Sequence, residues 1–341
     1  MLWTSGSGWA KPPDMLHLFH RLMSRLTGRE AALTRWNVKI LGNLLTTQHY
    51  MAGLAGSLVA LPEMPQPVGL DSRICRQADI ESDWLRHWCG ELDTLPTYHR
   101  KLWETCFVVQ ALWEAGMLAP GKRGLGFAVG HEPLPSFFAE RGADVLATDL
   151  DVSNRRAAGW IATDQHGGDA EELFFPKLVT RATFDARVTL RAVDMRHIPK
   201  DLERGFDFVW SVCSFEHLGS IEAGLDFVVN ASRCLKPGGI AVHTTEFNMA
   251  GEGPTVNRGP TVLFQEKHMR RLAEKLAQAG YEMMPFDATP GVKLMDGFID
   301  LPPYPGNDWP LPQQSTPHLL LSVHGFPTTS AGIIVRAPAA A

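Results

Sequence analysis

The sequence has few cysteines, and none of them is spaced like a pair. Five cysteines are scattered through 341 residues, without a Cys-x-x-Cys motif. An odd number at irregular spacing argues against a disulfide framework and against a cysteine-rich zinc site. Reduced thiols, and with them a cytoplasmic protein, are therefore expected.

Long apolar runs and dense basic stretches are also missing. No run approaches the roughly 20 apolar residues of a membrane-spanning helix, and residues 1–12 lack the charged and apolar regions of a signal peptide. The formal net charge is -5, whereas nucleic-acid affinity depends on clustered Lys and Arg. The expected partner is a small-molecule or glycan acceptor, with no extended nucleic acid and no membrane span. A homodimer is left open.

Two regions of the chain differ in pattern. Residues 1–118 place apolar side chains at helical spacing, which predicts a helical N-terminal segment that covers the substrate or the cofactor. Residues 119–341 alternate strand and helix patterns, which predicts an α/β fold with a doubly wound, Rossmann-like sheet. Within this domain, residues 289–317 are rich in Pro, Gly and Asp and are expected to form a functional insert.

The individual elements follow from periodicity and from turn residues. Strands are expected over 123–129, 144–148, 188–192, 206–212, 239–244 and 281–286, with a closing hairpin over 318–324 and 331–336; helices are expected over 15–26, 31–51, 80–92, 98–117, 135–141, 221–234 and 266–279.

A glycine-rich turn follows the first predicted strand of this domain. Gly126 and Gly130 would let the backbone approach a ligand closely, and the next helix would point its positive end there. Asp149 ends the second strand, where a carboxylate can accept hydrogen bonds from a ribose diol. A nicotinamide enzyme shares these features, but its fingerprint requires glycine at the position of Val129. From these residues alone, a strand-helix turn that binds no ligand remains an alternative.

The order of motifs further along the chain resembles that of class I S-adenosylmethionine (SAM)-dependent methyltransferases. Val193-Asp-Met195 ends the third strand, Phe206-Asp-Phe-Val-Trp-Ser211 forms the fourth, and Leu235-Lys-Pro-Gly-Gly239 leads into the fifth. The last of these is the most specific, and the resemblance spans roughly residues 120–290. It implies a seven-stranded methyltransferase sheet with SAM as cofactor. By the same resemblance the cofactor-binding residues are Gly126 and Gly130 at the methionine part, Asp149 at the ribose, Asp194 and Met195 at the adenine, and Ser211 near the methionine end.

The glycine loop departs from the family pattern at two positions. Gly124 stands where the family usually has an acid, and Ala128 stands in place of the middle glycine. Glu132, just past the turn, is a candidate to bind the SAM amino group instead of the missing acid. Capping of the following helix would explain Glu132 equally well.

Two polar clusters follow the fourth and fifth strands, where the acceptor should meet the methyl group. An imidazole titrates near neutral pH, so His217 is a candidate general base, with Glu216 beside it. Glu246 follows the fifth strand, and His243 within that strand is either functional or a buried core residue. The candidate catalytic residues are therefore His217, Glu216, Glu246 and His243.

The same clusters offer ligands for Mg²⁺ or another divalent ion. Some metal-dependent relatives, such as the ubiquinone O-methyltransferases and the small-RNA ribose methyltransferases, carry Glu-x-x-Glu-His. Here Cys213 takes the first Glu position. Glu216, His217 and Glu246 are the candidate ligands, and a bound ion would lower the pKa of an acceptor hydroxyl.

The stretches at 215–220, 243–248 and 300–304 resemble a bacterial methyltransferase subgroup associated with polysaccharide and glycosyl modification. This resemblance implies O-methylation of a sugar hydroxyl. Two alternatives stay open: methylation of a quinone, phenol or amine, and a non-catalytic SAM-fold protein that binds a partner. Polar residues that could contact a sugar in the insert are Asp296, Asp300, Tyr304, Asn307, Asp308 and Trp309, and His99 and Trp103 are candidates from the N-terminal segment.

Overall fold

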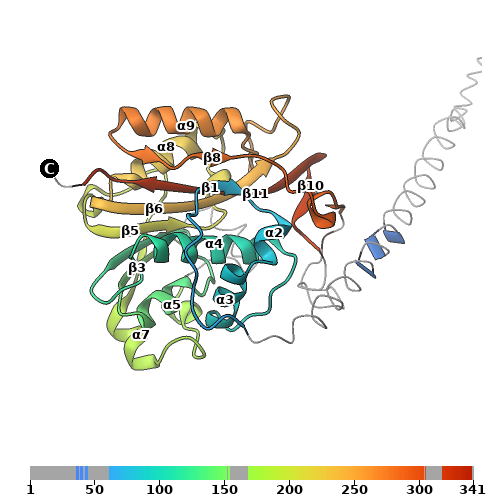
Figure 1. Ribbon diagram of the computed structural model, residues 1–341. Coiled ribbons are helices and arrows are strands. Elements are labelled where there is room, and N and C mark those ends of the chain that lie inside the picture. Colours follow the sequence, from blue (N-terminus) through green and yellow to red (C-terminus); the bar gives the residue numbers. More distant parts are fainter. Residues whose placement is uncertain are drawn as a thin grey trace, which may run out of the picture.

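The computed structural model shows one twisted sheet with helices on both faces (Figure 1). It describes residues 36–37, 39–40, 43–44, 61–151, 153, 168–302, 304 and 317–339. The predicted helix 15–26 and most of the predicted helix 31–51 lie outside this part of the chain. The described residues between 36 and 44 are helical, as predicted.

The strand order confirms the doubly wound, Rossmann-like sheet. The main path is β4-β3-β2-β5-β6-β11-β1-β8, and β7 also pairs with β11. Strands β2 to β6 run parallel, whereas β11 is antiparallel to β6. The order reverses at β2, which has β3 on one side and β5 on the other. The strands of this core are β2 (Arg123–Phe127), β3 (Asp144–Asp149), β4 (Val188–Ala192), β5 (Phe206–Ser211), β6 (Leu235–Asn248), β7 (Glu282–Met283) and β11 (Phe326–Arg336).

The sheet differs from the prediction at its antiparallel side. The three-residue strand β1 (Ser72–Ile74) lies between β11 and β8 (Phe286–Asp287), so the N-terminal segment contributes to the sheet itself. So short a strand has no readable periodicity. The predicted strand 281–286 is divided between β7 and β8 because these pair with different neighbours. Strand β6 extends to Asn248 because β11 pairs with it through Thr328.

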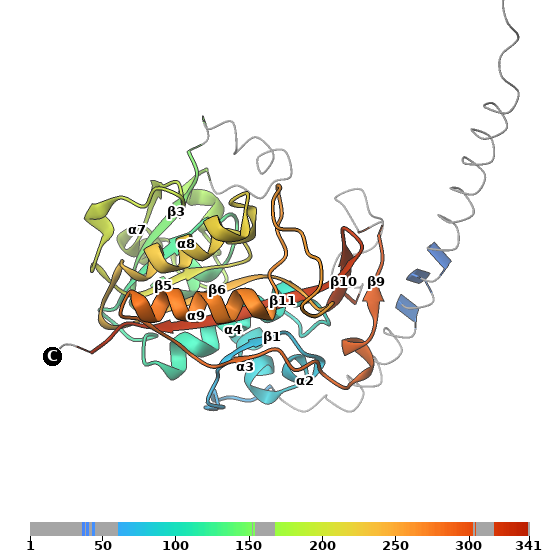
Figure 2. The ribbon, with the colours of Figure 1, turned by 90° about the horizontal axis from the view of Figure 1, so that it is seen from above.

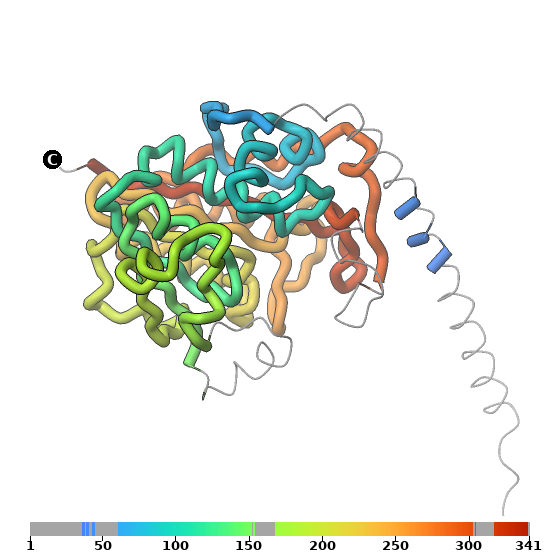
Figure 3. The backbone as a smooth tube through the Cα atoms, turned by 90° about the horizontal axis from the view of Figure 1, so that it is seen from below, coloured from blue at the N-terminus to red at the C-terminus, as the bar shows by residue number. Residues whose placement is uncertain are grey.

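Helices cover the two faces in separate groups (Figures 1 and 2). Helices α3, α4 and α5 enclose one apolar core, and α8 and α9 enclose the other. Figure 3 shows the first face, with the blue-to-cyan segment that holds α3 and α4 beside the green segment that holds α5. The helices are α2 (Gln77–Ile80), α3 (Asp83–Glu91), α4 (Arg100–Glu114), α5 (Leu134–Glu140), α7 (Arg181–Arg187), α8 (Ile221–Ser232) and α9 (Glu266–Gln278).

Close helix-to-sheet contact holds α4 in place. A Cβ at Gly332 of β11 would overlap the ring of Phe107 of α4, so glycine is required there. Helix α4 therefore lies directly on β6 and β11 and brings its first turn to the carboxyl end of the parallel strands. Shorter elements complete the described chain: strands β9 (Ile299–Asp300) and β10 (Leu320–Val323), and 3-10 helices η1 (Ala170–Leu173), η2 (Lys200–Leu202), η3 (Phe215–His217) and η4 (Leu294–Asp296).

Candidate active site

A cavity of ≈ 320 Å³ opens at the carboxyl ends of β2, β3, β4 and β5. We call it the cofactor cavity. It lies at the reversal of strand order, where doubly wound sheets bind their ligands. Its lining consists of Ala128–Glu132 after β2, Asp149 and Leu150 at β3, Val193–Arg196 after β4, Val212–Ser214 after β5, His217 and Leu218 at η3, and Lys101 of α4.

The structure brings five of the seven predicted cofactor residues to this cavity: Gly130, Glu132, Asp149, Asp194 and Met195. Gly126 does not line it, because it lies within β2, where a Cβ would come 2.6 Å from Val129 Cγ1. Ser211 is also fully buried, with its Oγ 2.8 Å from His243 Nδ1. Gly126 and Ser211 therefore pack beneath the cavity and are not part of its lining.

Asp149 is held rigidly at the cavity by backbone amides. Gly130 N donates to Asp149 Oδ2 at 3.0 Å, and Leu150 N donates to Oδ1 at 2.7 Å. Gly130 adopts a positive φ of 51°, which suits glycine and directs its amide toward β3. Each carboxylate oxygen can accept more than one hydrogen bond, so Asp149 can also accept from a diol.

The next strand presents its carboxylate in a similar way. Asp194 Oδ1 accepts a hydrogen bond from Arg196 N at 2.9 Å, which fixes the turn after β4. Met195 is buried between this turn and the second core. The cavity thus has an acidic side chain after β3 and an acidic and an apolar side chain after β4, as the motif predicted. The role of these residues as SAM ligands stays a prediction.

Glu132 faces the cavity and does not cap the helix that follows. The N-cap position of α5 is occupied by Pro133, which has no capping side chain. Glu132 Oε1 instead accepts a hydrogen bond from Trp210 Nε1 at 2.5 Å. Burial raises the pKa of Glu132 to about 8, against the effect of the Trp210 bond. A carboxyl group in this state holds a proton at neutral pH unless a cation comes close to it.

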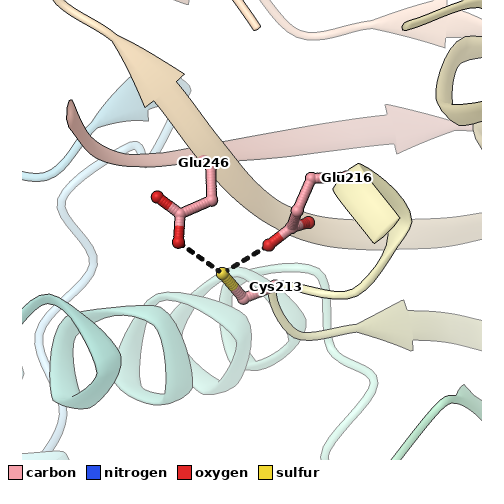
Figure 4. Close-up of side chains that lie close together, drawn as sticks. All are labelled: Cys213, Glu216 and Glu246. Carbon is pink, nitrogen blue, oxygen red and sulfur yellow. Dashed lines mark hydrogen bonds between the residues drawn. The ribbon is translucent and has the colours of Figure 1, made fainter. Parts of the chain in front are cut away.

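Behind the cavity lies a set of buried polar side chains that we call the Arg100 network. Arg100 Nη1 donates to Glu104 Oε1 at 3.0 Å, and Nη2 donates to Glu246 Oε1 at 2.5 Å. Cys213 Sγ donates to Glu216 Oε1 at 2.7 Å and lies 3.8 Å from Glu246 Oε1. Figure 4 shows Cys213, Glu216 and Glu246 converging from the end of β5, from η3 and from β6. All five residues are buried.

Cys213 connects this network to the cofactor cavity. It lines the cavity and has a φ of 45°, a backbone conformation that is costly for a residue other than glycine. Its amide is held by the carbonyl and the hydroxyl of Thr244, at 3.1 and 3.0 Å. Backbone strain of this kind is typical of positions where a side chain must be placed at a functional site.

The Arg100 network does not fit a divalent metal ion. Sulfur and oxygen atoms of Cys213, Glu216 and Glu246 do lie within 4.8 Å of one another. Arg100 Nη1, however, already donates to Cys213 Sγ at 3.5 Å, so a divalent ion among these atoms would lie against a guanidinium. The guanidinium of Arg100 already neutralises Glu246. The predicted ligand His217 does not belong to this group.

The two candidate histidines have different surroundings. His217 lines the cavity, and its Nδ1 lies 2.9 Å from the carbonyl oxygen of Pro260. Donation to that carbonyl fixes the proton on Nδ1, so Nε2 carries the lone pair that a general base needs. His243 is fully buried and does not line the cavity, and burial lowers its pKa to about 3. Of the two roles that the sequence left open for His243, the buried core position is the one observed.

A third group of polar side chains, the Asp300 cluster, was only partly predicted. Asp300 Oδ2 lies 2.8 Å from His318 Nδ1, and Asp300 Oδ1 accepts from Lys39 Nζ at 3.1 Å. His99 stacks on His318 with ring centroids 4.8 Å apart, and Arg100 N donates to the His318 carbonyl. His318 and Lys39 carry no local motif, so only their tertiary contacts reveal them.

The other residues predicted to contact a sugar lie in different surroundings. Asp296 accepts hydrogen bonds from the amides of Gln77 and Lys293, so it holds the chain around η4. Tyr304 donates to the carbonyl of Ser322 and lies 5.3 Å, centroid to centroid, from the ring of His318. The remaining candidates, Asn307, Asp308 and Trp309, lie outside the described residues. Trp103 is fully buried and donates to Asp79.

Comparison with known proteins agrees with the motif order. Residues 125–243 match the family of the methyltransferase domain. This match supports a class I SAM-dependent methyltransferase and covers β2 through most of β6. It does not test the polysaccharide subgroup. No curated protein matches the chain. Within the residues that the structure describes, none of the helices has the length and apolar character required to cross a membrane.

The solved structures to which this chain is similar include methyltransferases, all at low identity and low TM-score. Magnesium protoporphyrin IX methyltransferase from Synechocystis PCC 6803, with bound S-adenosylhomocysteine, is 12% identical, with 70% of this chain and 83% of that chain covered, at a TM-score of 0.41. The 1,6-didemethyltoxoflavin-N1-methyltransferase from Burkholderia thailandensis is 16% identical, with coverages of 67% and 76% and a TM-score of 0.37. A SAM-dependent methyltransferase from Methanosarcina mazei is 15% identical, with coverages of 66% and 96% and a TM-score of 0.40. Likenesses this distant do not identify an acceptor.

Proposed function

We propose that this chain is a SAM-dependent methyltransferase that methylates a hydroxyl of a sugar or glycan. The observation that carries the proposal is the cofactor cavity, which gathers the carboxylates of Asp149 and Asp194 and the imidazole of His217 at the reversal of strand order. That arrangement suits a nucleoside cofactor bound next to a side chain that acts as general base. The match of residues 125–243 to the methyltransferase domain supports the same function.

The cavity residues divide the work of holding the cofactor. Asp149, fixed by the amides of Gly130 and Leu150, accepts hydrogen bonds from the ribose hydroxyls. Asp194 and Met195 flank the adenine at the end of β4. When bound, SAM supplies an electrophilic methyl group on its sulfonium. The protein must then align the acceptor oxygen with that carbon.

His217 and Glu246 serve the acceptor. His217 lines the cavity and is held by Pro260 in the tautomer that leaves Nε2 able to take a hydroxyl proton. Glu216 supports it, with Oε1 at 3.7 Å from His217 Nε2. Glu246 does not line the cavity; its Oε2 is buried in the Arg100 network without a hydrogen-bond partner among the described residues, so we assign it a supporting role behind the methyl acceptor.

A sugar is the acceptor class that the sequence resemblance and the nearby Asp300 cluster favour. Next to the Arg100 network, the Asp300 cluster offers a carboxylate, two stacked imidazoles and the ring of Tyr304. Hydrogen-bonding groups beside aromatic faces suit a ring with several hydroxyls, and the sequence resemblance points the same way. A quinone, phenol or amine acceptor is the second candidate, favoured by the aromatic faces alone. We propose no metal, because the Arg100 network does not fit one. A cytoplasmic location stays a prediction from the cysteine pattern.

The first test is SAM binding by calorimetry, with wild type and Asp149→Ala. Wild type should bind, and the variant should bind at least about 30-fold more weakly, because charge-assisted hydrogen bonds to the ribose are lost. Asp144→Ala, an exposed change on the same strand, should bind like wild type. Binding without turnover on any acceptor would favour the non-catalytic alternative, and no wild-type binding would contradict the proposal.

Transfer is then assayed with tritiated SAM against sugars, nucleotide-sugars, phenols, quinones and amines, with and without EDTA. Methylation of a sugar that persists in EDTA is the expected outcome. Turnover on quinones, phenols or amines but not on sugars would contradict a sugar acceptor and favour the second candidate. Loss of turnover in EDTA with rescue by Mg²⁺ would contradict the metal-free reading of the Arg100 network.

A further inference from the structure

We propose that Glu132 binds the amino group of the cofactor's methionine part, in the role that an acid at position 124 would otherwise fill. The inference rests on the proposed function, since it assigns one group of SAM to one side chain. It starts from a steric observation in β2.

Position 124 has no room for an acidic side chain. Gly124 lies within β2 between β3 and β5, and a Cβ there would overlap the ring of Phe208. Phe208 is fully buried and packs on Phe138 of α5, with ring centroids 5.2 Å apart. The ring therefore has no unoccupied volume into which it could move. The absence of an acid from this strand is fixed by the core.

Glu132 supplies a carboxylate to the cofactor cavity from the loop just before α5. It lines the cavity together with Gly130 and Asp149, which places it near the glycine loop. Trp210 Nε1 binds Oε1 at 2.5 Å and thereby fixes the orientation of the carboxyl group. A partly buried carboxylate held by a neutral donor gains from a cationic partner.

The charges around Glu132 support this assignment. Asp149 of β3 and Glu104 of α4 are acidic neighbours that, together with burial, raise the pKa of Glu132 to about 8. The nearest cation on α4, Lys101, lines the cavity and pairs with Glu104 Oε2 at 3.4 Å. His131, next in the chain, pairs with Glu172 at 3.4 Å. Glu132 is therefore mostly protonated at pH 7 in the free protein.

Binding of an ammonium group to Glu132 must then release a proton. An ammonium favours the carboxylate and lowers its pKa, so the proton leaves Glu132 for the solvent as the ligand enters. Affinity for an amino-acid-bearing ligand should consequently rise with pH from 6 to about 8, as the free carboxyl ionises on its own. A ligand without the ammonium group should show neither effect.

Two adenosine ligands separate this contact from the rest of the site. S-adenosylhomocysteine carries the ammonium group on a neutral thioether, whereas 5′-methylthioadenosine has the same adenosine and thioether without the amino acid. Calorimetry of both ligands is compared for wild type, Glu132→Gln and the control Glu140→Gln, an exposed position at the end of α5, the helix that follows Glu132. Titrations at pH 7 in two buffers of different ionisation enthalpy count the protons released.

Glu132→Gln should weaken S-adenosylhomocysteine roughly 10- to 100-fold, the usual effect of losing a hydrogen bond to a charged group. Its affinity for methylthioadenosine should change less than about twofold, and Glu140→Gln should leave both ligands unchanged. Wild type should release close to one proton with S-adenosylhomocysteine and almost none with methylthioadenosine. Glu132→Gln should release almost none with either.

Equal weakening of both ligands, or no weakening of either, would overturn the assignment of Glu132. A thermal unfolding scan of each free variant excludes a folding defect. If wild type bound neither ligand, the proposed function itself would fail and the assignment with it. If wild type bound both and Glu132→Gln had no selective effect, only the role of Glu132 would fail.

Discussion

The cofactor cavity and the Arg100 network beside it are assembled in different ways. The cavity is formed by residues that directly follow β2, β3, β4 and β5, so each wall is a short loop after a strand. The Arg100 network joins residues that are far apart in the chain, such as Arg100 and Glu246, which are 146 positions apart. Parallel strands bring their carboxyl ends together in any chain with this topology. The network depends on one particular packing of α4 against β6.

The position of the cavity is therefore a property of the fold, whereas the Arg100 network is a property of this particular chain. Loops at the ends of strands tolerate variation better than the strands that carry them. The buried ions of the network must be matched to one another, because an unpaired charge in the interior is strongly unfavourable. We therefore expect the largest losses of stability from variants of the network, whereas variants of the cavity should act mainly on binding and rate, with smaller changes in stability.

The largest effect is expected from Arg100→Met. The change leaves Glu104 and Glu246 buried without their guanidinium partner, which should lower the free energy of unfolding by about 3–5 kcal/mol. Chemical denaturation monitored by circular dichroism measures this loss. The matched control is Arg270→Met, which removes two ion pairs at the exposed surface of α9 and should change the free energy of unfolding little, because solvent screens exposed pairs. Equal losses in the two variants would contradict the distinction.

The next effect concerns the cavity wall. His217→Gln keeps a polar side chain beside Pro260 but removes the base, so kcat should fall by about 100-fold or more. Binding of SAM and the unfolding midpoint should stay near the wild-type values. The measurement is turnover of the best acceptor from the screen between pH 6 and 9. A variant that retained the rate and pH profile of wild type would exclude His217 as the base.

The stability of the free protein should also depend on pH, because Glu132 titrates. Its folded pKa of about 8 lies above its unfolded value. A raised carboxyl pKa contributes stability that is complete below pH ~4.5 and is lost as pH rises through about 8. The unfolding midpoint of wild type should therefore fall between pH 5 and 9. Glu132→Gln should show a smaller fall and, near pH 8.5, be more stable by about 1–2 kcal/mol once solvent screening at the cavity is allowed for.

The smallest effect is expected in the glycine loop. Ala128 adopts a φ of 49°, where an L-residue other than glycine is strained by roughly 1–2 kcal/mol. Ala128→Gly relieves this strain but gives the unfolded chain more freedom, so the net gain should stay below about 1 kcal/mol. Calorimetric unfolding of the two proteins measures the difference. A loss of stability would show that the methyl group of Ala128 packs usefully against the cavity.

Much of the parallel half of the fold could be predicted from sequence. Strand β4 agrees residue by residue with the predicted range, and β2, β3, β5, α5 and α9 agree within two residues at each end. These elements have clear periodicity and are bounded by turn residues. The antiparallel half was less predictable, because β1 and the division between β7 and β8 depend on strand partners. No local pattern encodes those partners.

The residues of the candidate site also fall into a part that could be predicted from the sequence and a part that could not. The sequence by itself determined the walls of the cofactor cavity, since Gly130, Glu132, Asp149, Asp194 and Met195 each lie where a strand meets its loop. Only the tertiary structure decided that Gly126 and Ser211 pack beneath the cavity. It also gave Cys213 and Glu246 a shared guanidinium, and it joined Asp300 to His318 and Lys39. The physical reason is range: loop position follows from neighbouring residues, whereas the pairing of buried charges follows from which distant elements pack together.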